Sequence, residues 1–420
     1  MRSLKNPGLY TVFAFVVCLV VAFNPATAQT ESILHVFGKG TNDGINPQGS
    51  LIADSDGALY GVTNGGGKYN RGSVFKLSPS PSGTWGQNIL YSFSGADGSN
   101  PSGPLYMDPS HNLYGTTIFG GSANNGVVFE LTPGKPWKEK VIHDFSGTSD
   151  GGGPATGVIP GNKGTFYGTT FGGTVFRVSA QPDGTWKETV LQSLNFLFIP
   201  LGLVRNSAGS LYGMTEGGSF GNGAVYELSP PSDGKGAWTE NILYEFKGGS
   251  DGGWPVNNGS LILDNTGSLY GLTRVGGGGS CGCGTVFKLS RPAGGTGPWT
   301  KTTLYSFTAG SDGFDSSGSL LFDSTGALYG TTQYGGDDNL NGCSSNKLIL
   351  GCGTVFKLTP PPGGTGPWTE STLHAFELGN DGGLPQWGLL LNNGNLYGVT
   401  YLGGSADNLG TVFEINPESR

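Results

Sequence analysis

Six aspartates, each followed by glycine, recur at matching places along the chain and are the first candidates for chemistry. They are Asp43, Asp97, Asp150, Asp251, Asp312 and Asp381. Gathered on one face of a ring, their carboxylates could bind a cation or a cationic or hydroxyl-rich ligand. Calcium requires several oxygens converging on one point, which one carboxylate per repeat does not supply, so we expect no metal. The favoured interpretation is structural, because an Asp in such a turn accepts hydrogen bonds from its own backbone N–H groups.

Two tryptophans, Trp254 and Trp387, lie close in sequence to Asp251 and Asp381. An exposed indole beside polar loops could stack on a sugar ring, and the alternative is ordinary packing. Together with the six aspartates, these tryptophans define a predicted ligand face.

The histidines do not suggest a catalytic set. His35, His143 and His374 occupy equivalent positions in separate repeats, and His111 lies in a turn. No arrangement places one of them beside a serine nucleophile or a second histidine. We therefore predict no catalytic residue and no cofactor.

Four of the five cysteines form two close pairs. Cys343 and Cys352 can close one loop, and we predict a disulfide between them. Cys281 and Cys283 are separated by one residue, so a bond between them is possible but strained; pairing with the neighbouring loop is the alternative. A zinc site is not expected, because the chain has no Cys-x-x-Cys pairs.

These residues belong to an internal repeat that must position them. A Leu-Tyr-Gly-type element occurs seven times, with tyrosines 60, 114, 167, 212, 270, 329 and 397. A Gly-x-Val-Phe element follows each copy, with its aromatic at 75, 129, 176, 226, 287, 356 and 413. Each period contains four strand-like runs separated by Gly-rich turns, and no helical periodicity. Four antiparallel strands per period predict an all-β, seven-bladed β-propeller, in which Trp residues at the start of fourth strands cover the seams.

The two ends of the chain complete one blade. Residues 30–37 (TESILHVF) resemble the fourth strand at 369–376 (TESTLHAF), and the chain stops just after a third strand, 411–415. We expect a single propeller domain over 29–420, with residues 29–37 as the outer strand of the seventh blade. Such closure leaves no open sheet edge.

Three places break the repeat. The loop between the second and third strands of the third period is nearly absent, at 170–174, and the next connection, 194–200, lacks the Asp-Gly turn. The sixth period has a long loop, 335–353, that contains Cys343 and Cys352.

Residues 1–28 have the features of a secretory signal. Arg2 and Lys5 precede an apolar run, and Ala26-Thr27-Ala28 fits the cleavage rule, so we expect cleavage near Ala28 and a periplasmic or extracellular protein. No later segment is long and apolar enough to span a membrane. The net charge of −8 becomes more negative by two without Arg2 and Lys5. This acidity argues against nucleic acid as a partner, and we expect a monomer.

The repeated motifs, of which 328–332 (LYGTT) and 353–358 (GTVFKL) are the clearest copies, resemble the GloVer tandem repeat. That repeat occurs in exported bacterial proteins whose C-terminal anchors vary. The resemblance covers essentially the whole chain after the signal. It implies a secreted or surface-attached β-propeller and carries no established activity. This sequence departs from the family in ending at 416–420 without a sorting tail, so surface anchoring is not implied.

We therefore expect a non-catalytic propeller that binds an extracellular protein or polysaccharide. The first alternative is a carbohydrate-active propeller enzyme, a lyase or glycosidase, which would require two carboxylates about 5–10 Å apart near the central channel. The second is a purely structural scaffold.

Overall fold

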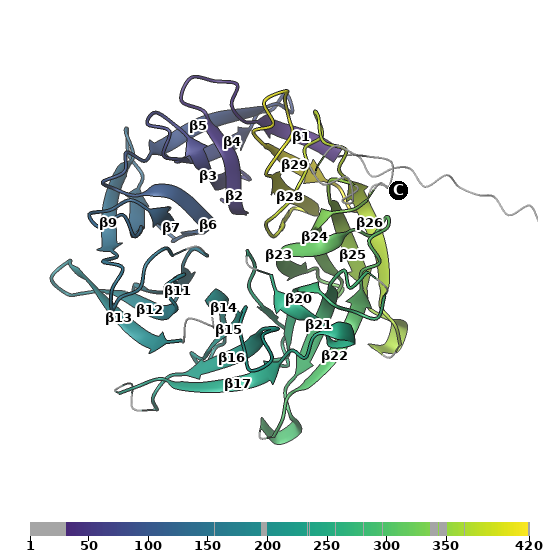
Figure 1. Ribbon diagram of the computed structural model, residues 1–420. Helices are drawn as coiled ribbons and strands as arrows, with labels where there is room; N and C mark the ends of the chain where they lie inside the picture. Colours follow the sequence, from purple (N-terminus) through teal and green to yellow (C-terminus); the bar gives the residue numbers. More distant parts are fainter. Residues whose placement is uncertain are drawn as a thin grey trace, which may run out of the picture.

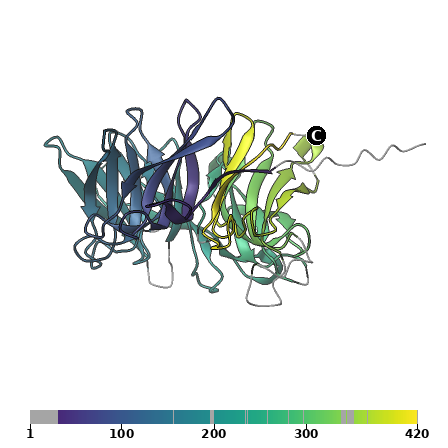
Figure 2. The ribbon, with the colours of Figure 1, turned by 90° about the horizontal axis from the view of Figure 1, so that it is seen from above.

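The protein is a ring of seven antiparallel sheets around a central axis (Figure 1). The computed structural model describes residues 31–418, apart from 155, 195–199, 233, 235, 257, 280, 296, 337–342, 344–350 and 365. Viewed at right angles, the loops gather on two opposite faces of the ring (Figure 2). The predicted seven-bladed β-propeller is confirmed.

In blades 1 to 6 the strands run outward from the axis in chain order. Blade 1 contains β2 (Gly44–Ala53), β3 (Leu59–Gly66), β4 (Ser73–Pro79) and β5 (Trp85–Ser92). Blade 2 contains β6 (Ser99–Met107), β7 (Leu113–Phe119), β8 (Val127–Thr132) and β9 (Lys138–Asp144). Blade 3 contains β10 (Ile159–Pro160), β11 (Thr165–Thr169), β12 (Thr174–Ala180) and β13 (Trp186–Ser193).

The next three blades follow the same order, except that the inner strand of blade 5 is in two pieces. Blade 4 contains β14 (Pro200–Arg205), β15 (Leu211–Thr215), β16 (Ala224–Ser229) and β17 (Thr239–Glu245). Blade 5 contains β18 (Gly253–Pro255), β19 (Ile262–Leu263), β20 (Leu269–Val275), β21 (Thr285–Ser290) and β22 (Thr300–Ser306). Blade 6 contains β23 (Phe314–Phe322), β24 (Leu328–Tyr334), β25 (Thr354–Thr359) and β26 (Thr369–Ala375).

Blade 7 is built from both ends of the chain. Its inner strands are β27 (Leu390–Asn392), β28 (Asn395–Thr400) and β29 (Thr411–Ile415), and its outer strand is β1 (Glu31–Val36). β1 runs antiparallel to β29, with Glu31 opposite Ile415 and Val36 opposite Thr411. The prediction that the N-terminal strand closes the last blade is therefore confirmed.

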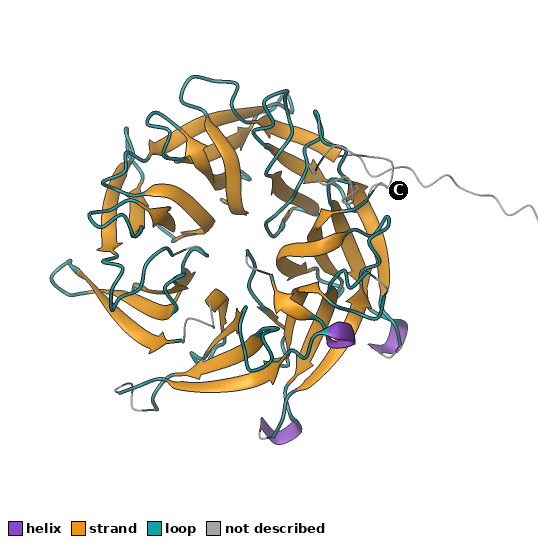
Figure 3. Cartoon of the chain, viewed as in Figure 1, coloured by secondary structure: helices purple, strands orange, loops and turns teal. Residues whose placement is uncertain are grey.

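The described residues contain three single turns of 3-10 helix (Figure 3), namely η1 (Gly249–Asp251), η2 (Ala293–Gly295) and η3 (Pro362–Gly364). None of these helices has the length or apolar character that crossing a membrane requires.

The aromatic of the Gly-x-Val-Phe element forms the core between neighbouring blades. Phe356 is fully buried and meets Phe307 of the preceding blade edge to face, with ring centroids 5.3 Å apart. The same ring covers Gly330, where an added Cβ would lie 2.6 Å from Phe356 Cζ. The contact recurs in the other blades at Gly61, Gly115, Gly168, Gly213, Gly271 and Gly398. The glycine of Leu-Tyr-Gly is therefore required by packing against this ring.

A second ring of glycines narrows the channel at the axis. It consists of Gly49, Gly103, Gly157, Gly202, Gly259, Gly318 and Gly388. A Cβ on Gly318 would lie 2.2 Å from the backbone nitrogen of Gly388 in the next blade, and one on Gly259 would lie 2.1 Å from the carbonyl oxygen of Gly318. The cavity beside this ring measures only about 50 Å³. A ligand of appreciable size must therefore bind at a face or between blades.

Tryptophans at the outer strands cover the seams between blades, as predicted. Trp85 meets Tyr397 of blade 7 with ring centroids 6.3 Å apart, and Trp238 meets Tyr167 of blade 3 at 5.9 Å. Each indole thus packs on the repeated tyrosine of the preceding blade.

Candidate functional site

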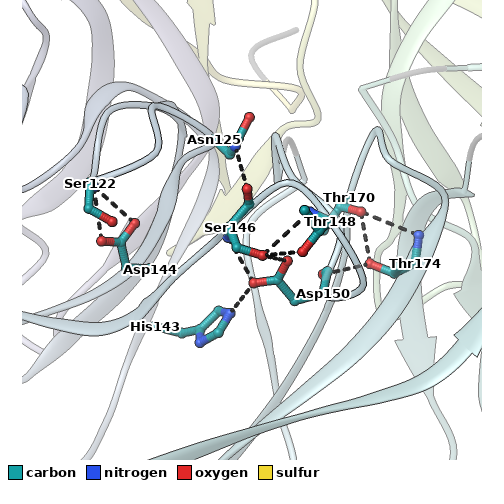
Figure 4. Close-up of polar contacts among 9 residues, drawn as sticks. All are labelled: Ser122, Asn125, His143, Asp144, Ser146, Thr148, Asp150, Thr170 and Thr174. Carbon is teal, nitrogen blue, oxygen red and sulfur yellow. Dashed lines mark hydrogen bonds and ion pairs between the residues drawn. The ribbon is translucent and has the colours of Figure 1, made fainter.

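The six repeated aspartates lie in the connections between blades, on the face that also carries the loops between second and third strands. Asp150 is typical (Figure 4): its Oδ2 accepts a hydrogen bond of 2.8 Å from the backbone N–H of Ser146, and its Oδ1 accepts one from the Ser146 hydroxyl. Burial raises the pKa of Asp150, but the hydrogen bonds from Ser146 outweigh it and lower the pKa. Backbone N–H groups of their own turns also donate to Asp97, Asp312 and Asp381. Ligand binding by these carboxylates stays a prediction.

A side chain from the outer strand of the same blade contacts each of these aspartates. The phenol of Tyr244 donates to Asp251 at 2.6 Å, and Nε2 of His374 lies 3.0 Å from Asp381 Oδ1. The equivalent partners elsewhere are His35, Tyr91, His143 and Tyr305. Three of the four histidines therefore hold a blade connection in place.

A third side chain reaches the aspartate from the outer strand of the next blade, and its charge varies. Gln87 donates to Asp43 at 2.7 Å, and the Lys301 ammonium lies 3.2 Å from Asp251 Oδ1. At the other junctions that have an Asp, the position is held by an acid: Glu31, Glu139, Glu188 and Glu370. We call each set of three side chains a junction triad. The acidic triads place two carboxyl groups together in a partly buried site.

We expect the acidic triads to make stability fall as the pH rises. Burial, and then the charge of Asp97, raise the pKa of Glu139 to about 7. The folded state thus binds the proton more tightly than the unfolded chain between about pH 4.5 and pH 7, and this stabilisation is lost as the pH rises through 7. In thermal melts, the free energy of unfolding of Glu139→Gln should exceed that of the wild type by about 1 kcal/mol at pH 8, after allowance for solvent screening. At pH 5 the two proteins should have nearly the same stability.

The reciprocal variant Gln87→Glu should be less stable than the wild type at pH 8 and close to it at pH 5. Differences that are the same at both pH values would contradict this account of the triads.

Of the two tryptophans on the predicted ligand face, one is exposed. The Trp254 side chain is 50% exposed, and its Nε1 donates to the carbonyl of Gly221 at 3.2 Å. Trp387 is only 5% exposed and packs in the apolar core between blades 7 and 1. Ordinary packing thus describes Trp387. Exposed aromatics that the sequence analysis did not single out lie on the same face: Tyr69, Phe119, Phe171 and Phe220.

The cysteines pair within their own loops. The structure joins Cys343 to Cys352 and Cys281 to Cys283. Residues 337–342 and 344–350 of the blade 6 loop, and 195–199 of the irregular connection before blade 4, lie outside the described residues.

On the opposite face, the repeated tyrosine of each blade belongs to a second polar cluster. In blades 1, 2, 4, 5 and 6 its hydroxyl contacts the residue that begins the turn between first and second strands. The residue opposite it on the third strand also belongs to the cluster. In blade 1, Asp54 accepts from Tyr60 at 2.9 Å and pairs with Lys76 at 3.1 Å. In blades 2, 4 and 7 the third strand supplies a carboxylate acceptor, at Glu130, Glu227 and Glu414. We call this set the turn cluster. It holds a carboxylate in every blade except blade 3.

Blade 3 has the tyrosine and the cation of the turn cluster but no carboxylate. Gly161 stands where blade 1 has Asp54, since its N–H bonds to Thr165 as that of Asp54 bonds to Ala58. Arg177 lies opposite Tyr167 in the pairing of β11 with β12. The Arg177 Nε is buried and has no hydrogen-bond partner among the described residues. No described residue supplies the acid that neutralises this position in the other blades.

A second arginine joins this incomplete cluster from blade 4. Arg205 ends β14, and its Nε is also buried without a partner. Both arginines line a cavity of about 420 Å³ between blades 3 and 4, walled by Tyr167, Trp238 and the turn at Pro230. Neither arginine has a carboxylate within ion-pair distance among the described residues. The cavity therefore offers two guanidinium groups, a phenol and an indole.

This cavity was not predicted from the sequence, although part of its signal is present there. The third period reads Gly161-Asn162-Lys163-Gly164 where the sixth reads Asp323-Ser324-Thr325-Gly326. The loss of the turn acid was therefore visible, but the approach of Arg205 from the next blade was not.

Comparisons with known proteins agree with this architecture. A family model described as the Gloeobacter/Verrucomicrobia repeat matches residues 18–174 and 171–343. A search of the curated proteins found no match. Among solved structures, one of streptogramin B lyase has a TM-score of 0.52 at 13% identity, over 92% of this chain and 97% of that one. One of puromycin hydrolase has a TM-score of 0.50 at 11% identity, over 90% of this chain.

The chain spans about half the length of that hydrolase, 52%. At such low identities both likenesses concern the fold alone. The repeat model covers more than half of the sequence, and the resemblance inferred from the repeated motifs is confirmed. This chain belongs to the Gloeobacter/Verrucomicrobia repeat family.

Proposed function

We propose that this protein is an exported, non-catalytic propeller that binds a glycan bearing carboxylate or sulfate groups, at or outside the cell surface. The observation that carries the proposal is the cavity between blades 3 and 4. Arg177 and Arg205 line it without a carboxylate partner among the described residues.

An anionic group would complete the turn cluster of blade 3. In blade 1 the same position contains the carboxylate of Asp54, bonded to a tyrosine and a cation. A guanidinium binds carboxylate or sulfate through two parallel hydrogen bonds, which are about twice as strong as neutral ones. The acidic group of the ligand would therefore occupy the position in blade 3 that a carboxylate of the chain occupies in the other blades.

The surroundings favour a sugar as the carrier of that acid. The Trp238 ring at the wall of the cavity can pack on a pyranose face. The chain as a whole has a net charge of −8, which repels a densely charged polyanion. We therefore favour a glycan with isolated acidic residues, recognised by close contacts in the cavity.

The test is calorimetric titration of the purified protein with an oligosaccharide that ends in glucuronic acid. Its carboxyl-reduced, neutral counterpart serves as the ligand control. We expect the acidic form to bind and the reduced form to bind at least about 10-fold more weakly, because each charge-assisted hydrogen bond contributes about 1.5–3 kcal/mol. Arg177→Ala and Arg205→Ala should each cause a loss of similar size.

Arg71→Ala is the matched control, since it removes an equal charge from an exposed position in a loop on the other face. It should leave the affinity unchanged. Equal binding of the acidic and reduced sugars, or equal losses in all three variants, would overturn the proposal. Turnover of the glycan would show that the protein is a carbohydrate-active enzyme, the first alternative considered above, and not a non-catalytic binding protein.

A further inference from the structure

The junction triad between blades 6 and 7 brings together three potential metal ligands. Glu31 lies on β1, His374 on β26 and Asp381 in the connection that follows. One oxygen or nitrogen of each lies within 4.8 Å of the others, and His374 Nε2 is 3.0 Å from Asp381 Oδ1. All three side chains are partly buried. This is the only such group of three among the described residues.

Two of the equivalent junctions give the aspartate a positively charged or proton-donating partner. Between blades 4 and 5 the chain itself places a cation against the aspartate, with the Lys301 ammonium 3.2 Å from Asp251 Oδ1. Between blades 7 and 1 it places an amide donor there, Gln87. Each partner offers positive charge or a proton to the carboxylate.

Glu31 offers neither, because it adds a second carboxyl group. Its Oε1 is buried and accepts no hydrogen bond from any residue that the structure describes. The triad therefore brings a second carboxyl group to the place where a sister junction holds an ammonium group.

We propose that Glu31, His374 and Asp381 form a binding site for a divalent cation of the zinc type. One imidazole and two carboxylates are the donor types that zinc accepts, at about 2.0–2.2 Å, and three protein ligands leave a fourth position open to water. The charge of the ion balances the two carboxylates. Donor atoms of a tetrahedral site are about 3.4 Å apart, so three groups that already lie within 4.8 Å of one another need only small shifts to share an ion.

The site lies on the seam where the ring is closed by the N-terminal strand. A bound ion would link β1 of blade 7 to the outer strand of blade 6. It would therefore hold the closing strand in place in addition to the pairing of β1 with β29. The consequence is a ring whose closure depends on the cation.

The test uses the full protein after removal of metals with EDTA. Zinc chloride is added, and both the melting temperature and the bound zinc per chain are measured. We expect one zinc per chain and a rise of roughly 2–5 °C when zinc exceeds its dissociation constant about 100-fold. The N-terminal segment should also become more resistant to proteolysis.

Two substitutions remove ligands by using residues that the chain places at its own sister junctions. Glu31→Gln copies Gln87, and His374→Tyr copies Tyr305, so both variants should fold and should lose the zinc response. Glu188→Gln is the matched control. Glu188 also faces an aspartate and a histidine, Asp150 and His143, but these three groups do not all lie within 4.8 Å of one another.

The control variant should keep both the zinc stoichiometry and the rise in melting temperature. Absence of zinc binding by the wild-type protein would overturn the proposal. So would an undiminished zinc response in Glu31→Gln or His374→Tyr. This inference is independent of the glycan proposal, because the two sites share no residue.

Discussion

A chain that begins at Gly38 should melt roughly 5–10 °C below one that begins at Gln29, or should fail to fold. The deletion removes β1, which pairs with β29 over Glu31 to Val36. It also removes Phe37, a fully buried ring whose centroid lies 5.2 Å from that of Phe75 in blade 1. Loss of one such buried ring alone costs about 3–5 kcal/mol, and the bare edge of β29 would be free to pair with other chains.

The measurement is thermal unfolding followed by circular dichroism, with light scattering to detect aggregation. A synthetic peptide of residues 29–37 provides the control, since it should restore much of the lost stability when it binds to β29. An unchanged melting temperature in the shortened chain would refute closure by the N-terminal strand.

Replacing Gly330 with alanine should destabilise the protein by about 3 kcal/mol, a large effect for one methyl group. The new Cβ would lie 2.6 Å from Cζ of Phe356 and 3.1 Å from Cδ2 of Leu320, inside a core that is fully packed. The ring of Phe356 is held on its other side by Phe307, so it cannot retreat without disturbing blade 5. Chemical denaturation of the two proteins measures the difference.

Gly86→Ala is the matched control, because Gly86 lies in outer strand β5 and an added Cβ there meets nothing within 4 Å. That variant should be as stable as the wild type. The double variant Gly330→Ala/Phe356→Leu should recover part of the loss, since a smaller side chain makes room for the methyl group. Equal effects of alanine at Gly330 and Gly86 would show that the packing argument is wrong.

Much of the architecture could be predicted because each repeat can be recognised from short motifs in the sequence. The Leu-Tyr-Gly and Gly-x-Val-Phe elements predicted the second and third strands of every blade, and the likeness of 30–37 to 369–376 predicted the closing strand. The glycine ring at the axis was not predicted. Its signal is a single glycine two residues before an apolar side chain, as at Gly318 and Leu320, and this is inconspicuous in a chain with 79 glycines.

The polar sites were predictable only in part, because their members come from different blades. The sequence marks Asp97 as a repeated residue, but it does not indicate that Glu139 of the next blade faces it. Likewise, Arg177 and Arg205 belong to separate periods, and only the ring arrangement brings them to one cavity. Repetition predicts what each blade contains, whereas contacts across a seam depend on how neighbouring blades pack.

The most direct test of the central claim is a crystal structure of the protein grown with the glucuronic acid-terminated oligosaccharide. We predict density for the sugar carboxylate between the guanidinium groups of Arg177 and Arg205, with the pyranose ring against Trp238. The account would be contradicted if the sugar were bound on the opposite face, at Trp254 or the repeated aspartates, while the cavity contained only water.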